Sequence, residues 1–412
     1  MKFTLLLLYC CFATISFSQT KILFDATKAE TAGNADWVID ADTYNLGFSN
    51  GPAVVGAGDE ANPQQIPTPS QSGISAGTPG TYWSGGLSSW GVDMVKKGFV
   101  VETLPYNGQI TFGNLSNPQD LSHYKVFVVC EPNIVFTSAE KTAILDFVHA
   151  GGGLFMISDH DVSDRNNDNW DSPHIWNDLM NNNNVLSNPF GITFDYANFS
   201  ETSTNIPNLP SDSLLHEPMG NVTEVQWNNG TSMTLYPAQN SSVKGVAYKS
   251  GSSFGNANVM AAHALYGNGR VAAIGDSSPA DDGSGDPNDA LYDGWITDAA
   301  GNHERLIVNT TIWLAGSGTV TGIEEKNAAA LNFNYTNPCD NDCIFTSAQS
   351  QETNGNLNFY LFDIRGCQLK ELANVNAERF SFSTEGIEPG MYFFSFRKNG
   401  RDVQRGKMVV GN

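Results

Sequence analysis

Four short apolar runs in the sequence each end in a carboxylate, and this pattern constrains the fold more than any other feature. The runs have the length of strands, and segments with helical spacing lie among them at 88–97 and 137–150. This alternation predicts a parallel sheet with helical crossovers, and so an α/β fold with a parallel-sheet core. The four runs are 22–25 (ILFD), 126–131 (VFVVCE), 154–159 (LFMISD) and 271–276 (VAAIGD).

The acidic residues that end these runs predict a functional site. The carboxyl ends of parallel strands lie along one edge of a sheet, where open α/β folds bind their ligands. We therefore expect the four carboxylates to converge, joined by His160 and Asp161. Like charges so close repel, so the cluster needs a metal ion, shared protons or a cationic partner. The candidate catalytic residues are Asp25, Asp159, His160 and Asp276, with Glu131 as a further member.

Two acidic loops are candidate sites for a divalent metal. One follows the run 154–159, and the other is the glycine-rich stretch 275–286. Carboxylate oxygens at short spacing suit calcium, magnesium or manganese, whereas a histidine suits zinc or manganese. The alternative is that these loops use their side chains to cap turns or remain solvated. The candidate metal ligands are Asp159, Asp161, Asp164, Asp281 and Asp286.

Aromatic residues near the same edge are candidates for substrate binding. Trp37, Trp83 and Trp170 could stack on sugar faces, although the alternative is that they pack in the core. Ser158 could act as a nucleophile with a nearby histidine as base, but no G-x-S-x-G motif surrounds it. Glu30 could also form an acid/base pair with a strand-end carboxylate.

Length and composition predict several parts in the chain. The 412 residues suit two or three modules, and a short apolar core after Lys2 predicts a signal peptide. From residue 331 short alternating strands predict a small all-β sandwich. The expected parts are a signal peptide (1–19), an α/β domain (20–315) with loop-rich insertions (28–80 and 159–255), a linker (316–330) and the sandwich (331–412).

The net charge of −22 makes nucleic acid an unexpected partner, because no basic run could contact a phosphate backbone. No stretch after the signal peptide is apolar and long enough to span a membrane, and we expect no nucleotide cofactor. Cys130 ends an apolar run and is expected to be a buried free thiol. One disulfide is expected among Cys339, Cys343 and Cys367, with its pairing open.

The C-terminal part resembles the type A sorting domain of the type IX secretion system. The residues that carry the resemblance lie at 359–366 (FYLFDIRG), 387–392 (IEPGMY) and 407–410 (KMVV), with a weaker match at 336–338 (TNP). The resemblance implies export by the type IX machinery, with the mature protein secreted or anchored at the outer surface. It implies no catalytic activity.

The α/β part resembles the class I glutamine amidotransferase-like superfamily, and within it the trehalose-utilisation-like branch. The residues that carry this are 126–132, the helical segment that follows, and 151–157 (GGGLFMI). That superfamily places a nucleophilic cysteine on the tight turn after the strand matching 154–158. Here the turn reads Ser158-Asp159-His160-Asp161, so glutaminase activity is not expected.

Taken together, these features predict a secreted hydrolase that acts on an extracellular polysaccharide or related polymer. Its site would be rich in carboxylates and would bind a divalent metal or use acid/base chemistry. One alternative is a metal-dependent phosphoesterase or nuclease. The other is a non-catalytic carbohydrate-binding surface protein.

Overall fold

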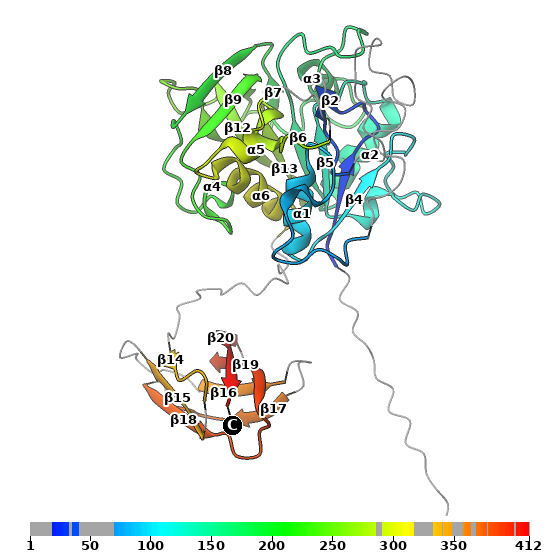
Figure 1. Ribbon diagram of the computed structural model, residues 1–412. Helices are drawn as coiled ribbons and strands as arrows, with labels where there is room; N and C mark the ends of the chain where they lie inside the picture. The colour runs from blue at the N-terminus through cyan, green and yellow to red at the C-terminus, as the bar shows by residue number, and fades with distance from the viewer. Residues whose placement is uncertain are drawn as a thin grey trace, which may run out of the picture. The chain divides into compact units, whose positions relative to one another are not determined.

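The computed structural model forms two compact units, Met1–Gly322 and Ile323–Asn412 (Figure 1). The structure describes residues 19–32, 35–40, 70–285, 291–316, 333–339, 341–347, 357–363, 368–376, 378–398 and 401–411. Nearly all of the expected signal peptide and linker, much of 28–80, Asp286 and Cys367 lie outside these ranges. Within the described residues, no helix is both long and apolar enough to cross a membrane.

The first unit is built on a nine-stranded mixed sheet with the order β4-β1-β5-β6-β13-β12-β10-β7, and β11 pairs with β12. Its first five strands are parallel to one another, and the rest pair antiparallel. Numbered along the chain, the parallel strands have the order 2-1-3-4-5. These strands are β1 (Lys21–Asp25), β4 (Val100–Leu104), β5 (Val126–Cys130), β6 (Gly153–Ile157) and β13 (Gly269–Ile274).

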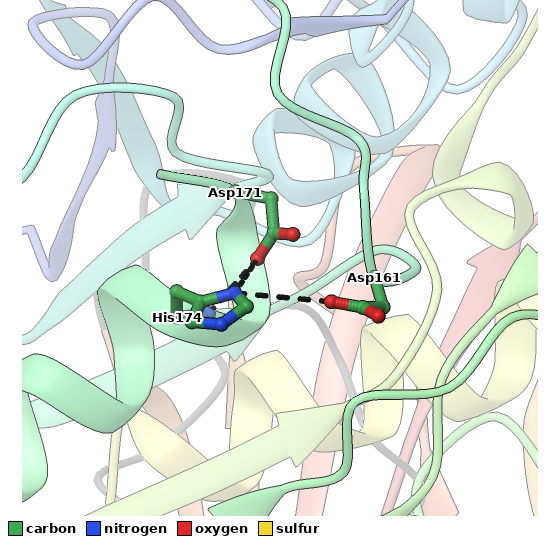
Figure 2. Close-up of side chains that lie close together, drawn as sticks. All are labelled: Asp161, Asp171 and His174. Atoms are coloured by element: carbon green, nitrogen blue, oxygen red, sulfur yellow. Dashed lines mark hydrogen bonds and ion pairs between the residues drawn. The ribbon is translucent and has the colours of Figure 1, made fainter. Parts of the chain in front are cut away.

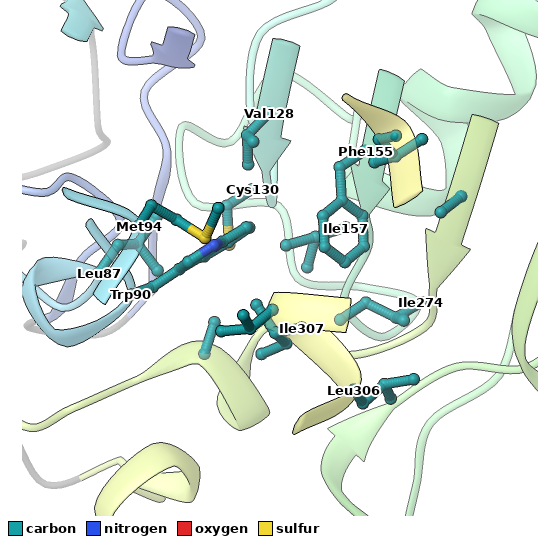
Figure 3. Packing of buried hydrophobic residues seen from close by; sticks show 14 of the residues in the cluster. Leu87, Trp90, Met94, Val128, Cys130, Phe155, Ile157, Ile274, Leu306 and Ile307 are labelled. Atoms are coloured by element: carbon teal, nitrogen blue, oxygen red, sulfur yellow. The ribbon is translucent and has the colours of Figure 1, made fainter. Parts of the chain in front are cut away.

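Helices cover both faces of the parallel strands because successive strand residues point to opposite sides. Phe24, Val128 and Ile157 pack with α1 (Ser88–Lys96) and α6 (Asn302–Leu314). Figure 3 shows Trp90 and Met94 of α1 and Leu306 and Ile307 of α6 against this face. The alternate residues, such as Leu23, Val129 and Met156, pack with α2 (Ser138–His149) and α3 (Ser172–Asn181). The α/β prediction for this unit is therefore confirmed.

Helix α2 begins where the sequence predicts. Thr137 accepts a hydrogen bond from the Glu140 amide, and the Glu140 carboxylate accepts one from the Thr137 amide, so that both ends of a capping box are present. The helix then buries Ile144, Leu145 and Phe147 against the sheet. Burying each such side chain contributes about 1.5–3 kcal/mol.

The segment 159–255 is not the separate loop-rich subdomain that its composition predicts. Three of its strands join the main sheet, and α3 packs on one face of that sheet. Strands of three to five residues among Asn-rich turns are too short to show a clear periodicity, so their long-range pairing defines them. The strands concerned are β7 (Ile192–Phe194), β10 (Met233–Leu235) and β11 (Lys244–Tyr248), while β8 (Phe199–Ser203) and β9 (Val225–Gly230) form their own pair.

Shorter elements complete the first unit, together with the long strand that pairs antiparallel with β13 across a short turn. They are β2 (Thr31–Ala32), β3 (Ala35–Asp36), η3 (Gly80–Tyr82), η4 (Leu121–His123), α4 (Ser213–His216), β12 (Val259–Tyr266), η5 (Ser278–Ala280) and α5 (Gly294–Thr297).

Among the described residues of the second unit the named strands pair antiparallel, and the all-β prediction for this part is confirmed. Its two sheets bury one apolar cluster, in which Phe345 of one sheet packs on Phe359 and Phe394 of the other. A disulfide joins Cys339 to Cys343. The sheets consist of β14 (Phe333–Tyr335), β15 (Asp342–Ser347) and β18 (Arg379–Ser383), and of β17 (Gln368–Leu372), β16 (Leu357–Phe362), β19 (Gly390–Lys398) and β20 (Arg401–Val410).

Candidate functional site

The strand-end carboxylates lie along one edge of the sheet. Strands β1, β5, β6 and β13 are adjacent and parallel, so their carboxyl ends share that edge. Asp25 ends β1, Glu131 follows β5, and Asp159 and Asp276 lie two residues beyond β6 and β13. The chain order reverses between β1 and β5, and α/β folds bind ligands at such a reversal. The edge is therefore the first place to look for chemistry.

Glu131 is the centre of the buried part of this edge. Its φ of 49° lies in the left-handed region, which costs a residue with a Cβ about 1–3 kcal/mol. The carboxylate is fully buried and accepts hydrogen bonds from Trp37 Nε1 at 2.9 Å, Ser277 Oγ at 2.8 Å and Arg165 Nη2 at 3.1 Å. Several contacts from distant segments thus hold a strained residue in place.

Arg165 joins Glu131 to Asp159. Its Nη2 lies 3.3 Å from Asp159 Oδ2, and His160 Nδ1 lies 2.8 Å from the same oxygen. Asp276 completes the cluster from β13 and accepts hydrogen bonds from the amides of Asn228 and Ser278. We call Glu131, Asp159, His160, Arg165 and Asp276 the buried cluster.

Burial controls the protonation of this cluster. It raises the pKa of Glu131 to about 8, with a further rise from Asp159 that Arg165 opposes. It also raises the pKa of Asp276 to about 7 and, against the effect of His160, the pKa of Asp159. Burial alone would lower the pKa of His160, but the contact with Asp159 outweighs it and the pKa is raised.

The charges of the buried cluster balance only with a bound proton. Arg165 and, when it is protonated, His160 face three carboxylates, and a net charge in a largely buried site is disfavoured. The raised pKa values of Glu131 and Asp276 agree with a proton held at neutral pH. The cluster can therefore both donate and accept a proton, as acid/base catalysis requires.

Asp25 belongs to a separate acidic pair on the same edge. Its described hydrogen bonds are with Thr27, at 2.9 Å to the hydroxyl, and with the Glu30 carboxyl. Burial raises the pKa of Asp25 and raises that of Glu30 well above its usual range. Burial thus favours the protonated form of both carboxyls, and none of their described hydrogen bonds reaches Asp159 or Asp276.

A second group of ligand-type side chains lies in the loop after β6 and at the start of α3 (Figure 2). His174 Nδ1 is 2.6 Å from Asp171 Oδ1 and 3.9 Å from Asp161 Oδ1, and its ring stacks on Tyr196 at 4.0 Å. Asp171 also caps α3 by accepting from the His174 amide. These three ligand residues could hold a divalent metal ion. We call them the exposed group because Asp161 and His174 are partly exposed, although Asp171 is buried.

The other predicted metal ligands do not join the exposed group. Among the described residues, the exposed group is the set of three or more such side chains whose ligand atoms lie close together. Asp159 belongs to the buried cluster. Asp164 accepts from the amides of Asp168 and Asn169, so it caps a turn. Asp281 is fully buried and accepts from the Gly283 amide. Asp286 lies outside the described residues.

The prediction that tryptophan side chains stack on a sugar is also corrected. Trp37 and Trp83 are only 1% and 5% exposed, so no sugar ring can stack on them in this conformation. Trp37 instead donates to Glu131. Trp170 is partly buried and packs against the core on the α2 side. The packing alternative therefore holds for Trp37 and Trp83.

A Ser–His–Asp triad is not formed at Ser158. Its buried hydroxyl donates to the Asp159 carbonyl at 3.3 Å and not to an imidazole. His263 lies 2.9 Å from Asp212, and no seryl contact is described for it. Cys130 is the buried free thiol that the sequence predicts, and burial raises its pKa well above the usual range, which disfavours a thiolate.

Arg165 was missing from every set of candidate residues, whereas Asp171 was considered only as part of the acidic loop and His174 only as a base for Ser158. Arg165 stands in an Asn- and Asp-rich loop, where no local pattern marks it. Asp171 and His174 had a usable signal, because residues three apart at a helix start lie on the same side of the helix.

No family model matches the chain, and no curated protein matches it. Among solved structures, the mmIFT52 N-terminal domain is 12% identical, with 72% of this chain and 99% of that chain covered and a TM-score of 0.41. A cytoplasmic protein from Salmonella typhimurium is 15% identical, with 55% and 86% covered and a TM-score of 0.32. Gan42B, a GH42 beta-galactosidase, is 10% identical, with 76% and 32% covered and a TM-score of 0.26. At these TM-scores the likenesses carry no argument about function.

Proposed function

We propose that this protein is a hydrolase that uses the buried cluster for acid/base chemistry on an extracellular polysaccharide or related polymer. The observation that carries the proposal is Glu131. It is a fully buried glutamate on left-handed backbone, with its pKa raised to about 8 and with Asp159 and Arg165 beside it. Strained residues and perturbed carboxyl groups concentrate at catalytic sites.

In this proposal the two carboxyl groups take different roles. Protonated Glu131 donates its proton to the oxygen of the leaving group, while Asp159, held by His160, activates water or attacks the substrate. Arg165 offsets the negative charge left on the two carboxylates. Since Arg165 is only 24% exposed and covers both groups, the substrate must displace the loop that carries it.

The test is hydrolysis of a polysaccharide panel by the full chain and by Glu131→Gln and Asp159→Asn variants. We expect each variant to lose at least 100-fold in kcat, because acid/base groups contribute 10²–10⁴-fold. Asp164→Asn, a turn-capping residue in the same loop, is the matched control and should keep full activity. Folded variants with wild-type activity would refute the assignment.

A second candidate is a metal-dependent phosphoesterase or nuclease, and the exposed group favours it. Two carboxylates and an imidazole suit zinc or manganese better than calcium, which prefers oxygen ligands alone. Such an activity would be abolished by EDTA, restored by added metal and lost in His174→Ala. Glycan binding without product release would instead support the third reading, a carbohydrate-binding surface protein.

We also propose a family and a route of export. The strand order 2-1-3-4-5, together with residues 126–132 and 151–157, supports a glutamine amidotransferase-like unit with flavodoxin-like topology. The signal-peptide pattern and the 359–366 and 387–392 motifs support secretion by the type IX system. A reporter fused to residues 1–19 and 331–412 should reach the outer surface or medium of a host with that system. Retention in the periplasm would refute this route.

A further inference from the structure

A cavity of about 290 Å³ lies apart from both carboxylate groups, among β9, α5 and the start of α6. Its volume is close to the lower end of small-molecule sites, about 300 Å³. It is lined by Glu224, Gln226, Tyr292, Thr297, Asp298, Ala299, Ala300 and His303.

One wall of the cavity is held rigidly by His303, which is 2% exposed. Its Nδ1 donates to the Gly294 carbonyl at 2.9 Å, and its Nε2 accepts from the backbone N–H of Gln226 at 2.9 Å. Burial lowers the pKa of this imidazole, so the ring is neutral at pH 7. With both nitrogens engaged, His303 shapes the wall and leaves ligand contacts to its neighbours.

The neighbours retain hydrogen-bonding capacity. The Tyr292 hydroxyl donates to Gln226 Oε1 at 3.1 Å, which orients the side-chain amide of Gln226. Within the described residues, Gln226 Nε2 has no hydrogen-bond acceptor. Glu224 likewise has no hydrogen-bond donor among the described residues. The Asp298 oxygens are already engaged by the amides of Ala300 and His303. The cavity thus offers the Gln226 N–H₂ as a donor group, the Glu224 carboxylate as an acceptor group and a tyrosine ring.

This combination selects the class of ligand. A carboxylate and an amide N–H₂ are matched by neighbouring hydroxyl groups, since one hydroxyl can donate to Glu224 while the next accepts from Gln226. The tyrosine ring offers an apolar face beside them. The lining contains no lysine or arginine, which disfavours an anionic ligand. We infer that the cavity is a saccharide-binding subsite for a single sugar residue.

The cavity is linked to the buried cluster through β9. Gln226 stands two residues before Asn228, whose amide donates to Asp276. A polymer bound at the cluster could therefore be held along the same strand, and this use of the subsite rests on the proposed function. Sugar binding in the cavity is a separate property that can be measured without hydrolysis.

The experiment is ligand-observed NMR and calorimetry of the full chain with glucose, galactose, xylose and N-acetylglucosamine, and with methylamine as the amine probe. We expect at least one sugar to bind, and Gln226→Leu and Tyr292→Ala to weaken it at least tenfold. Tyr236→Ala, which removes an exposed tyrosine elsewhere, should leave binding unchanged. Circular dichroism checks that each variant is folded.

Absence of sugar binding, binding unchanged by both variants, or binding of methylamine alone would overturn the subsite. The Asp159→Asn variant separates this result from the proposed function. If that variant binds sugar like the wild type, the cavity stands whether or not the wild type hydrolyses a polymer. If the wild type hydrolyses a polymer but Gln226→Leu does not weaken sugar binding, the proposed hydrolase is supported and the proposed subsite is refuted.

Discussion

The buried cluster and the exposed group use the same chemical types in different surroundings. All three carboxylates of the first are buried, whereas the second combines the buried Asp171 with the partly exposed Asp161 and His174. Asp159 and Asp161 are two residues apart, yet Asp159 is nearly buried while the Asp161 side chain is 32% exposed. In the buried cluster an arginine, a histidine and a bound proton offset the carboxylates. In the exposed group the His174 side chain is 38% exposed. Water and any bound cation can therefore offset the charge of its carboxylates.

This difference shows that depth, and not residue type, sets the chemistry of an acidic pair. Charges in a low-dielectric site interact several times more strongly than at a surface, so the buried cluster must hold its proton and its arginine. Solvent screens Asp161 and His174 of the exposed group, which are then free to exchange ligands. Four predictions test this contrast, starting with the largest effect.

The largest effect is expected from Arg165→Met. This change leaves Glu131 and Asp159 buried without their cation, and breaking a buried pair typically costs about 3 kcal/mol or more. The free energy of unfolding from urea titration measures it. Lys97→Met, which breaks the Lys97–Asp93 pair on α1, should cost under about 1 kcal/mol. Equal losses of unfolding free energy in Arg165→Met and Lys97→Met would contradict the proposed difference between buried and exposed charge pairs.

The second effect is stabilisation by a divalent cation at the exposed group. Manganese or zinc at a hundred times its Kd should raise the free energy of unfolding by about 2.7 kcal/mol. His174→Ala should abolish both this gain and the heat of binding in calorimetry. His263→Ala is the control, because His263 contacts one carboxylate, that of Asp212, and forms no group of three metal ligands among the described residues. Stabilisation that survives His174→Ala would show that the metal binds elsewhere.

The third effect is a dependence of stability on pH that arises in the buried cluster. A carboxyl whose pKa is raised by folding binds its proton more tightly in the folded chain. Its contribution is therefore full below the unfolded pKa and is lost as pH rises to the folded value, about 8 for Glu131 and about 7 for Asp276. Between about pH 5 and its folded pKa, each such proton lowers the free energy of unfolding by about 1.4 kcal/mol for every unit that pH rises.

Urea titrations at several pH values measure this slope. Glu131→Gln should flatten it, because glutamine does not titrate. Asp164→Asn serves as the control and should leave the slope as in the wild type. A wild-type slope in Glu131→Gln would mean that other groups carry the pH dependence.

The smallest effect is expected from the stability of Asp164→Asn itself. Asp164 caps an exposed turn, and asparagine keeps one acceptor for the Asp168 and Asn169 amides. The loss in free energy of unfolding should be about 0.5 kcal/mol or less, and metal binding should not change. A loss of metal binding would return Asp164 to the ligand set that the sequence predicts.

Local patterns predicted much of the fold because they depend on neighbouring residues. The strand runs, the Thr137–Glu140 capping box and the alternation in the C-terminal strands all have this origin. Contacts between distant segments were not predictable in this way. Trp37 and Glu131 are 94 residues apart, and nothing near Trp37 in the sequence marks it as a hydrogen-bond donor to a carboxylate.

The sequence by itself determined that the strand-end carboxylates share one edge, because parallel strands with crossover helices leave no other arrangement. Only the tertiary structure decided which of them are buried and what faces them. Covering the edge depends on where the loop after β6 folds back, and that loop brings Arg165 onto Glu131 and Asp159. Burial then sets the pKa values, and for this reason Asp159 and Asp161 belong to different sites.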